Sequence, residues 1–361
     1  MCKRIFANQT SDQGDVPFFK IGTIGGTPDA YISKDLFEEY RAKYNYPRKG
    51  EVMITCAGTV GKTIVFDGED AYFQDSNIVW LSNPKQLYIN PFLNYVLSRV
   101  NWNKLNSTTI TRIYNDNLRE LVINFPTVKE QEKVVALLSI LDKRIAIQNK
   151  VIEDLITLEK EIINHVFKTL NTVSQPLSII SERVTARNTN ALCNNVLTIS
   201  ARDGLISQLD FFNKSVASHN LSNYILLKKG DFAYNKSYSA DHPWGAIKHL
   251  EIYEEGVLSP LYFCFRPLKD HIDTEYLQLY FETDLWHKHI SDISVEGARN
   301  HGLLNMSVGD FMALPVPVPE LNIQHDIARS LKSLRNKKSN EMRYREFLLR
   351  QKTYLLSHLF L

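Results

Sequence analysis

The feature that most constrains the fold of this chain is an internal repeat. Residues 118–167 align with residues 311–360 at one constant offset and without a gap. Chance similarity between two amphipathic helices is the alternative, but a shared proline, glutamine and terminal His-x-Phe favour a repeat of one structural unit. The identical pairs include Pro126/Pro319, Gln131/Gln324, Leu138/Leu331, Leu141/Leu334, Glu153/Glu346, Leu155/Leu348, His165/His358 and Phe167/Phe360.

Each copy of the repeat predicts a short strand, a proline stop and one long helix. The strands are expected at "LVINF" (121–125) and "ALPVPV" (313–318). Pro126 and Pro319 end them, because proline cannot donate a hydrogen bond within a sheet. Beyond the prolines, apolar residues follow the 3-4 spacing of a coiled-coil seam. The predicted seam of the first helix comprises Val134, Leu138, Leu141, Ile145, Ile152, Leu155, Ile162 and Val166, with Gln148 and Glu159 as polar interruptions.

A helix of this length cannot bury its apolar stripe alone, and the second copy is the expected antiparallel partner. The second helix has basic residues at seam positions, namely Lys338, Arg345 and Lys352. Snug packing there requires these cations to pair with Glu159 of the first helix.

The segments before the two helices also correspond. "RKGEVMITCAGTVGKTIVFDG" and "KKGDFAYNKSYSADHPWGAIKH" both contain Lys-Gly-acid, a strand, a polar loop, a glycine and more strand. We therefore predict an α+β chain of two similar domains, each a mixed β-sheet with helices, separated by two long helices that pair as an antiparallel coiled coil. The expected boundaries are 1–126, 127–170, 171–318 and 319–361.

The stretch "AGTVGKT" (57–63) resembles the end of a phosphate-binding loop. Such a loop needs a first glycine five positions before the Gly-Lys pair, and that position here is Cys56. The loop should also begin a helix, whereas "TIVFDGEDAYF" predicts strand, turn and strand. The pattern therefore argues against nucleotide hydrolysis and favours a glycine-rich turn with a lysine at its tip.

Composition restricts the class of protein further. The chain has 361 residues, with 42 Lys and Arg against 40 Asp and Glu, so a general basic coat for nucleic acid is not expected, although a local basic face is compatible. The four cysteines are widely spaced, which suits a reducing cytoplasm and neither a disulfide framework nor a zinc site. The sequence contains no run of about 18 apolar residues, so a membrane span is not expected. The first residues, "MCKRIFANQTS", contain no apolar core of a secretory signal.

The chain resembles the specificity subunit of a type I restriction-modification system. The residues that carry the likeness are "KGEVMITCAGTVGKT", "FQDSNIVWL", "TTITRIYNDNLRELVINFPTVKEQEKVVALLSILDKRI" and "LPVPVPELNIQHDIA". The resemblance implies two target recognition domains and a pair of long spacer helices. It departs from the family at the start, where the first domain looks shortened.

The resemblance also implies what the chain does. Such a subunit has no catalysis and no cofactor of its own, reads a bipartite, asymmetric site in double-stranded DNA, and docks two DNA adenine methyltransferase subunits and motor/endonuclease subunits. No glycine-rich cofactor fingerprint or helicase motif is found in the sequence. The alternative is a coiled-coil scaffold whose globular ends bind other proteins and show no DNA specificity.

Two pairs of polar stretches are the candidates for DNA contact. Glycine-rich or polar loops between strands allow close backbone approach, and lysine and hydroxyl groups suit phosphate. Arginine and asparagine can read guanine and adenine with paired hydrogen bonds. The alternatives are an ordinary solvated turn, a helix cap, and packing of Trp244 under its hairpin. The candidates are Thr59, Lys62, Thr63, Thr109 and Arg112 in the first domain and Lys236, Tyr238, Ser239, Trp244, Arg299 and Asn300 in the second.

Overall fold

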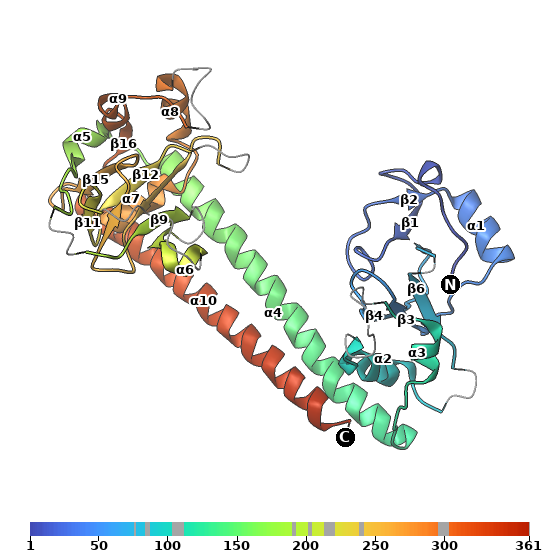
Figure 1. The fold of residues 1–361 in the computed structure, drawn as a ribbon. Coiled ribbons are helices and arrows are strands. Elements are labelled where there is room, and N and C mark those ends of the chain that lie inside the picture. Colours follow the sequence, from blue (N-terminus) through green and yellow to red (C-terminus); the bar gives the residue numbers. More distant parts are fainter. Residues whose placement is uncertain are drawn as a thin grey trace. The chain divides into compact units, whose positions relative to one another are not determined.

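The structure is a computed structural model of residues 1–361, and it describes all of them except 76, 84–86, 103–111, 190–192, 201–203, 213–220, 238–241, 295–302 and 361. The chain forms two compact units (Figure 1). Unit 1 comprises residues 1–150 and 343–361, and unit 2 comprises residues 151–342. Within the described residues, no helix has the length and apolar character needed to cross a bilayer.

Two long helices, α4 (Val128–Thr169) and α10 (Leu321–His358), contribute to both units (Figure 1). Each begins just after the proline of its repeat copy, as predicted. At the start of α4, the Thr127 amide and hydroxyl donate to the Glu130 carboxylate at 3.0 and 2.8 Å. This Thr-x-x-Glu arrangement closes the first turn of the helix and explains where α4 begins.

Unit 1 contains two three-stranded sheets, with strand orders β4-β3-β6 and β2-β1-β5. In the first sheet β3 pairs antiparallel with both neighbours, and in the second β1 runs parallel to β5. The elements are η1 (Ala7–Gln9), β1 (Val16–Phe19), β2 (Tyr31–Ile32), α1 (Lys34–Lys43), β3 (Val52–Thr55), β4 (Thr63–Val65), β5 (Tyr72–Phe73), β6 (Ile78–Leu81), α2 (Asn90–Arg99) and α3 (Asn115–Arg119).

Unit 2 is built around a four-stranded sheet of order β13-β12-β15-β8, joined by three two-stranded sheets: β10-β9, β11-β14 and β16-β7. Its strands are β7 (Ser174–Pro176), β8 (Ser181–Arg183), β9 (Leu197–Ser200), β10 (Gly204–Ser207), β11 (Ile225–Lys228), β12 (Phe232–Asn235), β13 (Ala246–His249), β14 (Glu255–Leu258), β15 (Phe263–Pro267) and β16 (Pro315–Pro317). Its helices are α5 (Leu177–Ile180), α6 (Gln208–Phe212), α7 (Thr274–Phe281), α8 (His287–Ile293) and α9 (Val308–Met312).

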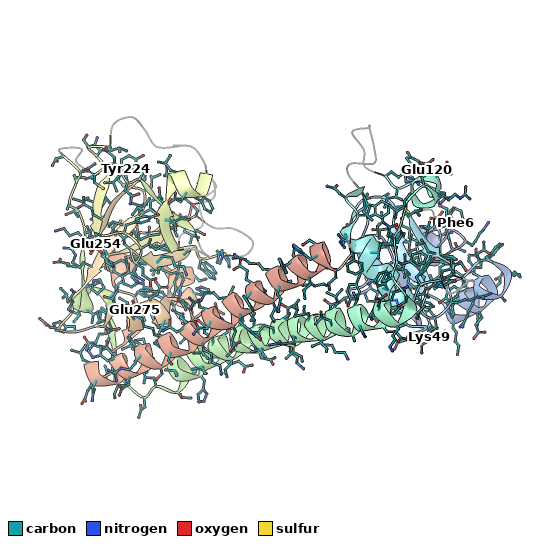
Figure 2. All side chains as sticks on the ribbon, turned by 90° about the horizontal axis from the view of Figure 1, so that it is seen from below. Phe6, Lys49, Glu120, Tyr224, Glu254 and Glu275 are labelled. Carbon is teal, nitrogen blue, oxygen red and sulfur yellow. The ribbon has the colours of Figure 1, made fainter. Side chains whose placement is uncertain are left out.

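The two units repeat one arrangement, as the sequence predicted. The buried strand β3 lies between β4 and β6, just as β12 lies between β13 and β15. In the chain, α2 follows β6 and α7 follows β15. The helices α3 and α9 lie at the start of the two repeat copies. Side chains fill the interior of each unit (Figure 2).

The prediction of a strand at 121–125 is wrong. This segment is irregular, whereas its counterpart in the second copy forms β16, which pairs with β7. A strand exists only where another strand takes up its backbone hydrogen bonds, and the described part of unit 1 supplies no counterpart of β7.

The repeated glutamine makes the same three hydrogen bonds in both units. Gln131 accepts from the Ile89 amide at 2.9 Å, and its Nε2 donates to the carbonyl oxygens of Pro126 at 2.9 Å and Leu87 at 3.4 Å. Gln324 accepts from the Asp273 amide at 2.8 Å, and its Nε2 donates to the carbonyl oxygens of Pro319 at 2.8 Å and His271 at 3.2 Å. Both side chains are fully buried, so each long helix is tied to the segment that enters α2 or α7.

The predicted seam of α4 holds for its first two thirds and then shifts by one residue. Leu138, Leu141, Gln148, Ile152, Leu155 and Glu159 are buried, with Val134 and Ile145 half-buried. Beyond Glu159, Ile163 and Phe167 are buried, whereas the predicted Ile162 and Val166 are half-buried. The cause is tertiary packing, since the Phe167 ring lies 5.2 Å from Tyr276 and 5.6 Å from Tyr280.

Two of the three predicted basic positions of α10, Lys338 and Lys352, pair with acids of α4. No acid is seen to pair with Arg345 in the described residues, and its Nε is buried without a hydrogen-bond partner. In unit 2, Glu159 binds both Arg335, at 2.7 Å, and Lys338. In unit 1, Lys352 lies 2.5 Å from Asp142 and therefore pairs with a different acid than the sequence suggested. Burial acts to raise the pKa of Glu159, but hydrogen bonds from Lys338 and Arg335 outweigh it and hold this pKa below its ordinary value.

Replacing either buried glutamine should loosen only its own unit. Gln131→Ala leaves the Ile89 amide and two carbonyl oxygens without this partner, which costs about 1–3 kcal/mol. Hydrogen exchange should then accelerate at the Ile89 amide in Gln131→Ala and at the Asp273 amide in Gln324→Ala. Glu132→Ala, at an exposed neighbouring position, is the control and should stay within about 0.5 kcal/mol. Unchanged exchange at both amides would contradict the assignment.

The stability of unit 2 should fall on the acid side of pH 4. Because the pKa of Glu159 is lowered on folding, its stabilising effect is complete above the unfolded value of about 4.3 and is lost as the pH falls through the folded value. Denaturant titrations at pH 7 and pH 3 measure this loss. Glu159→Gln should be less stable at pH 7 and should show a smaller loss between the two pH values. An equal acid loss in both proteins would contradict the prediction.

Candidate nucleic-acid interface

In unit 1, a tight loop follows β3 and carries three of the predicted contact residues. The Thr55 amide donates to the Lys62 carbonyl at 3.0 Å, and the Lys62 amide donates to the Thr55 hydroxyl oxygen at 3.0 Å. The Thr55 hydroxyl also donates to the Thr59 carbonyl. These bonds close the loop from inside and leave the side chains of Thr59 and Lys62 exposed, with Thr63 half-buried at the start of β4.

Two glycines give this loop its shape. Gly58 and Gly61 have φ angles of +65° and +83°, in the left-handed region that favours glycine. A Cβ atom on Gly61 would lie 2.1 Å from Cδ1 of Trp102, which is itself buried. The resemblance to a phosphate-binding loop therefore has a packing origin, because a tryptophan ring rests against the second glycine. The strand predicted after Lys62 is present as β4.

Arg112 lies at the base of the same loop. The Ile113 amide donates to the Cys56 carbonyl at 2.9 Å, which fixes the chain after Arg112 beside the end of β3. Burial raises the pKa of the Cys56 thiol to about 11, and the nearby positive charge of Arg112 opposes this rise. The Arg112 guanidinium also lies 5.8 Å from the centre of the Tyr114 ring. The loop at residues 57–62 and the segment after Arg112 thus meet at the end of β3. We call this place the loop rim of unit 1.

Unit 2 repeats this convergence with different side chains. Lys236 follows β12 directly, and its carbonyl accepts from the Leu304 amide at 3.0 Å. The Lys236 ammonium lies 4.4 Å from the centre of the Phe263 ring, and burial lowers its pKa. A Cβ atom on Gly245 would lie 2.1 Å from the Asn235 carbonyl oxygen, so the chain returns from the loop only with glycine there. Segments on either side of α7 and α8 therefore meet at the end of β12.

The remaining predicted residues divide into two groups. Trp244 is half-buried, packs against the hydrophobic core of unit 2, and accepts at its carbonyl from the Tyr234 hydroxyl at 2.9 Å. These contacts agree with the alternative that it supports the hairpin. Thr109, Tyr238, Ser239, Arg299 and Asn300 lie outside the described residues.

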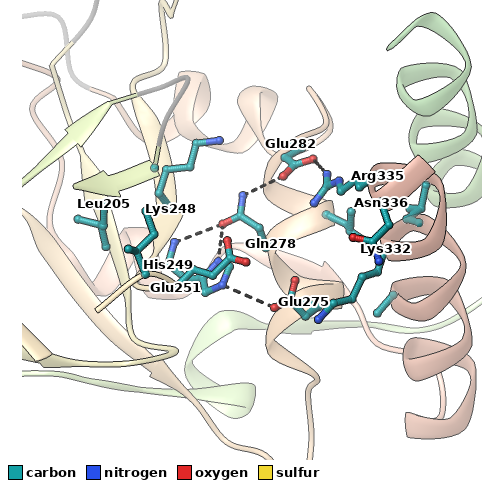
Figure 3. A pocket seen from close by; sticks show the side chains of 15 residues that line it. Leu205, Lys248, His249, Glu251, Glu275, Gln278, Glu282, Lys332, Arg335 and Asn336 are labelled. Atoms are coloured by element: carbon teal, nitrogen blue, oxygen red, sulfur yellow. Dashed lines mark hydrogen bonds and ion pairs between the residues drawn. The ribbon is translucent and has the colours of Figure 1, made fainter. Parts of the chain in front are cut away.

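Unit 2 also contains a polar cavity of about 290 Å³ between β13, α7 and α10 (Figure 3). Gln278 accepts from the His249 amide at 3.3 Å and donates to Glu282 at 3.3 Å, and Glu282 pairs with Arg335. Arg335 in turn binds Glu159 of α4. This network joins the sheet to the two long helices, which explains it as structural.

Sequence reasoning missed the residues that hold these rims in place. The loops are positioned by Trp102 and Phe263, and the long helices by the two buried glutamines. The sequence identified these glutamines only as an identical pair within the repeat. Their identity in one gapless register was the available signal. For Trp102 no signal existed, because its contact with Gly61 joins positions far apart in the chain.

The comparisons with known proteins bear on the first part of the chain most directly. Residues 1–157 match the family model described as "Type I restriction modification DNA specificity domain". A Haemophilus influenzae protein named as a type I restriction enzyme specificity subunit is 50% identical over 155 residues. That match covers 43% of this chain and 40% of the relative, so the compared segment is less than half of either protein.

Solved structures extend the likeness in fold to nearly the whole chain. An M. genitalium type I restriction-modification S subunit has a TM-score of 0.54 at 16% identity, covering 100% of this chain and 92% of that one. A structure described as showing complex assembly and conformational transition of the type I R-M system has a TM-score of 0.56 at 12% identity, covering 96% and 91%. Residues 1–157 are therefore similar to a type I restriction-modification DNA specificity domain, and the predicted resemblance to type I specificity subunits is confirmed.

Proposed function

We propose that this chain reads duplex DNA through the loop rims of its two units, as the specificity subunit of a type I restriction-modification complex. The observation that supports this most is the repeated convergence of two polar segments at the end of a buried strand, at Cys56 in unit 1 and Lys236 in unit 2. Each rim carries at least one cation whose position is fixed by its neighbours. The Lys62 amide is bonded to Thr55, and the Lys236 ammonium lies over the Phe263 ring. Cations position a protein on the phosphate backbone, and rigid supports favour selective contacts.

The site that the two rims read together is bipartite and asymmetric. The rims share a backbone arrangement but almost no side chains, and base recognition depends on the pattern of donors and acceptors. We assign DNA contact to Thr59, Lys62, Thr63, Thr109 and Arg112 in the first half-site and to Lys236, Tyr238, Ser239, Arg299 and Asn300 in the second. Trp244 contributes there by supporting the loop.

The partners of the chain are two DNA adenine methyltransferase subunits and motor/endonuclease subunits. In unit 1 the long helices present apolar side chains outside their seam, which suits the docking of a partner helix. Leu137, Ile140 and Ile147 of α4 are 43%, 57% and 64% exposed, and Phe347 and Tyr354 of α10 are 60% and 61% exposed. The members of the pairs Ile140/Ile147 and Phe347/Tyr354 are one heptad apart.

The chain contributes recognition and leaves the chemistry to its partners, without a cofactor of its own. Burial raises the pKa of the thiols of Cys2 and Cys56 to about 11 and of Cys264 to about 12, which makes them poor nucleophiles. In the described part of the chain, no cluster of three His, Cys, Asp or Glu side chains could hold a metal ion.

Lys62→Ala tests the contact of the first rim with phosphate. Loss of one phosphate contact should weaken binding similarly for all DNA sequences and reduce the slope of log K against log salt by about one unit. Lys49→Ala is the matched control, because Lys49 is an exposed lysine before the opposite end of β3 (Figure 2). Equal slopes for Lys62→Ala and the unmodified chain would remove Lys62 from the interface.

Arg299→Ala tests the reading of bases in the second half-site. The substitution should relax the preference at one half-site only, at a cost of roughly 1–3 kcal/mol. The measurement is methylome sequencing of cells that contain the variant and its methyltransferase. A relaxed preference in both half-sites, or in neither, would contradict this role.

A further inference from the structure

Unit 2 contains another cavity, which lies beside its loop rim (residues 235–237 and 242–245). This cavity has a volume of about 310 Å³ and lies between the rim, β13 and residues 281–287, which lead from the end of α7 to the start of α8. Because β13 is the last strand of its sheet, the cavity extends from the rim along a sheet edge. Its basic lining residues are His242, Lys248 and His287.

The repeat relates this cavity to Lys62 of unit 1. When the two units are aligned on their Lys-Gly-acid segments, β4 pairs with β3 as β13 pairs with β12, so Lys62 corresponds to Ala246 and Ile64 to Lys248. Residues two apart on a strand share a face. A Cβ atom on Gly25 would lie 3.7 Å from Cε of Lys62 and 2.9 Å from Cγ2 of Ile64, so both side chains do lie on one face. Lys248 therefore lies on the strand face that Lys62 has in unit 1, two residues further from the rim.

Lys248 brings a positive charge to the cavity without a carboxylate of its own. Its side chain is half-buried, and no ion pair with it is found among the described residues. Glu282 lines the same cavity, but its carboxylate accepts from Gln278 at 3.3 Å and pairs with Arg335 of α10 (Figure 3). Burial lowers the pKa of Lys248, the charge of Glu282 opposes this, and the charge of Arg335 adds to it. An anion that enters the cavity would compensate the ammonium.

The segment after α7 holds His287 in place. Trp286 is buried, and its Nε1 donates to the Phe281 carbonyl at 3.1 Å. The His287 amide donates to the Asp284 carbonyl at 3.1 Å, and the His287 ring Nδ1 lies 3.5 Å from the Asp284 carboxylate. Burial lowers the pKa of His287, the charge of Asp284 opposes this, and the charge of His242 adds to it. The two imidazole rings are thus near enough to interact, and they offer ring nitrogens to the cavity from the rim and from α8.

We propose that this cavity binds a phosphate group of the duplex backbone, with the Lys248 ammonium as its charged partner and the rings of His242 and His287 as hydrogen-bond donors. The single negative charge of a phosphate diester matches the one ammonium. The inference rests on the proposed function, and it gives the second half-site a counterpart of the contact assigned to Lys62. Such a contact positions the protein on DNA and carries no sequence information. Free phosphate shares this chemistry and is the other source of such a group.

Lys248→Met in the full chain tests this contact. Binding of a pool of random-sequence duplexes should weaken, and the slope of log K against log salt should fall by about one unit. Lys248→Arg keeps the charge and should keep the slope. Lys332→Met is the matched control and should also keep it, because Lys332 is an exposed lysine that lines the neighbouring polar cavity and not this one. An unchanged slope in Lys248→Met, or an equal loss in Lys248→Met and Lys248→Arg, would overturn the proposal.

Reductive methylation of the unmodified chain, read by mass spectrometry, separates the two sources of phosphate. Duplex DNA should protect Lys248 and leave Lys332 reactive, whereas inorganic phosphate at the same ionic strength should protect Lys248 only at far higher concentration. Protection by inorganic phosphate alone, or by neither, would overturn the proposal. If Lys62→Ala lowers the salt slope and Lys248→Met does not, only this inference fails, whereas a chain that binds no duplex would contradict the proposed function as well.

Discussion

The buried glutamine side chain at the start of each long helix is the interaction on which the rest of the structure depends. Gln131 and Gln324 are themselves fully buried, and each bonds one amide and two carbonyl groups of the chain around it. Both residues also occupy the first position of the helical seam, seven residues before Leu138 and Leu331. The same side chain therefore fixes where the helix meets its domain and which face of the helix enters the seam.

The seam itself is stabilised by charge as well as by apolar packing. Glu159 meets Arg335 and Lys338 in unit 2, and Asp142 meets Lys352 in unit 1. A buried ion pair contributes little net stability, but separating its members is costly. A pairing of the helices in another register would leave these charges unmatched, so the ion pairs select one alignment of α4 and α10 over others.

The sequence predicted those parts of the fold that depend on local pattern. The repeat, the long helices, the strand after Lys62 and the equivalence of the two sheets follow from periodicity and turn chemistry. The strand at 121–125 and the end of the seam were mispredicted because both depend on distant partners, namely the missing neighbour of Ile123 and the packing of Phe167 on Tyr276. The residues that contact DNA are harder to predict, because a solvated lysine and a phosphate-binding lysine have the same local sequence. Here only the convergence with the segment after Arg112 distinguishes Lys62 from other exposed lysines.

Hydrogen exchange of the full chain with and without duplex DNA tests the central claim most directly. A pool of duplexes of random sequence at low salt is a suitable probe, because the phosphate contacts do not depend on sequence. The proposed function predicts slower exchange in both loop rims, at residues 57–62 in unit 1 and at residues 235–237 and 242–245 in unit 2. Slower exchange confined to the outer faces of α4 and α10, or unchanged exchange in both rims, would contradict it.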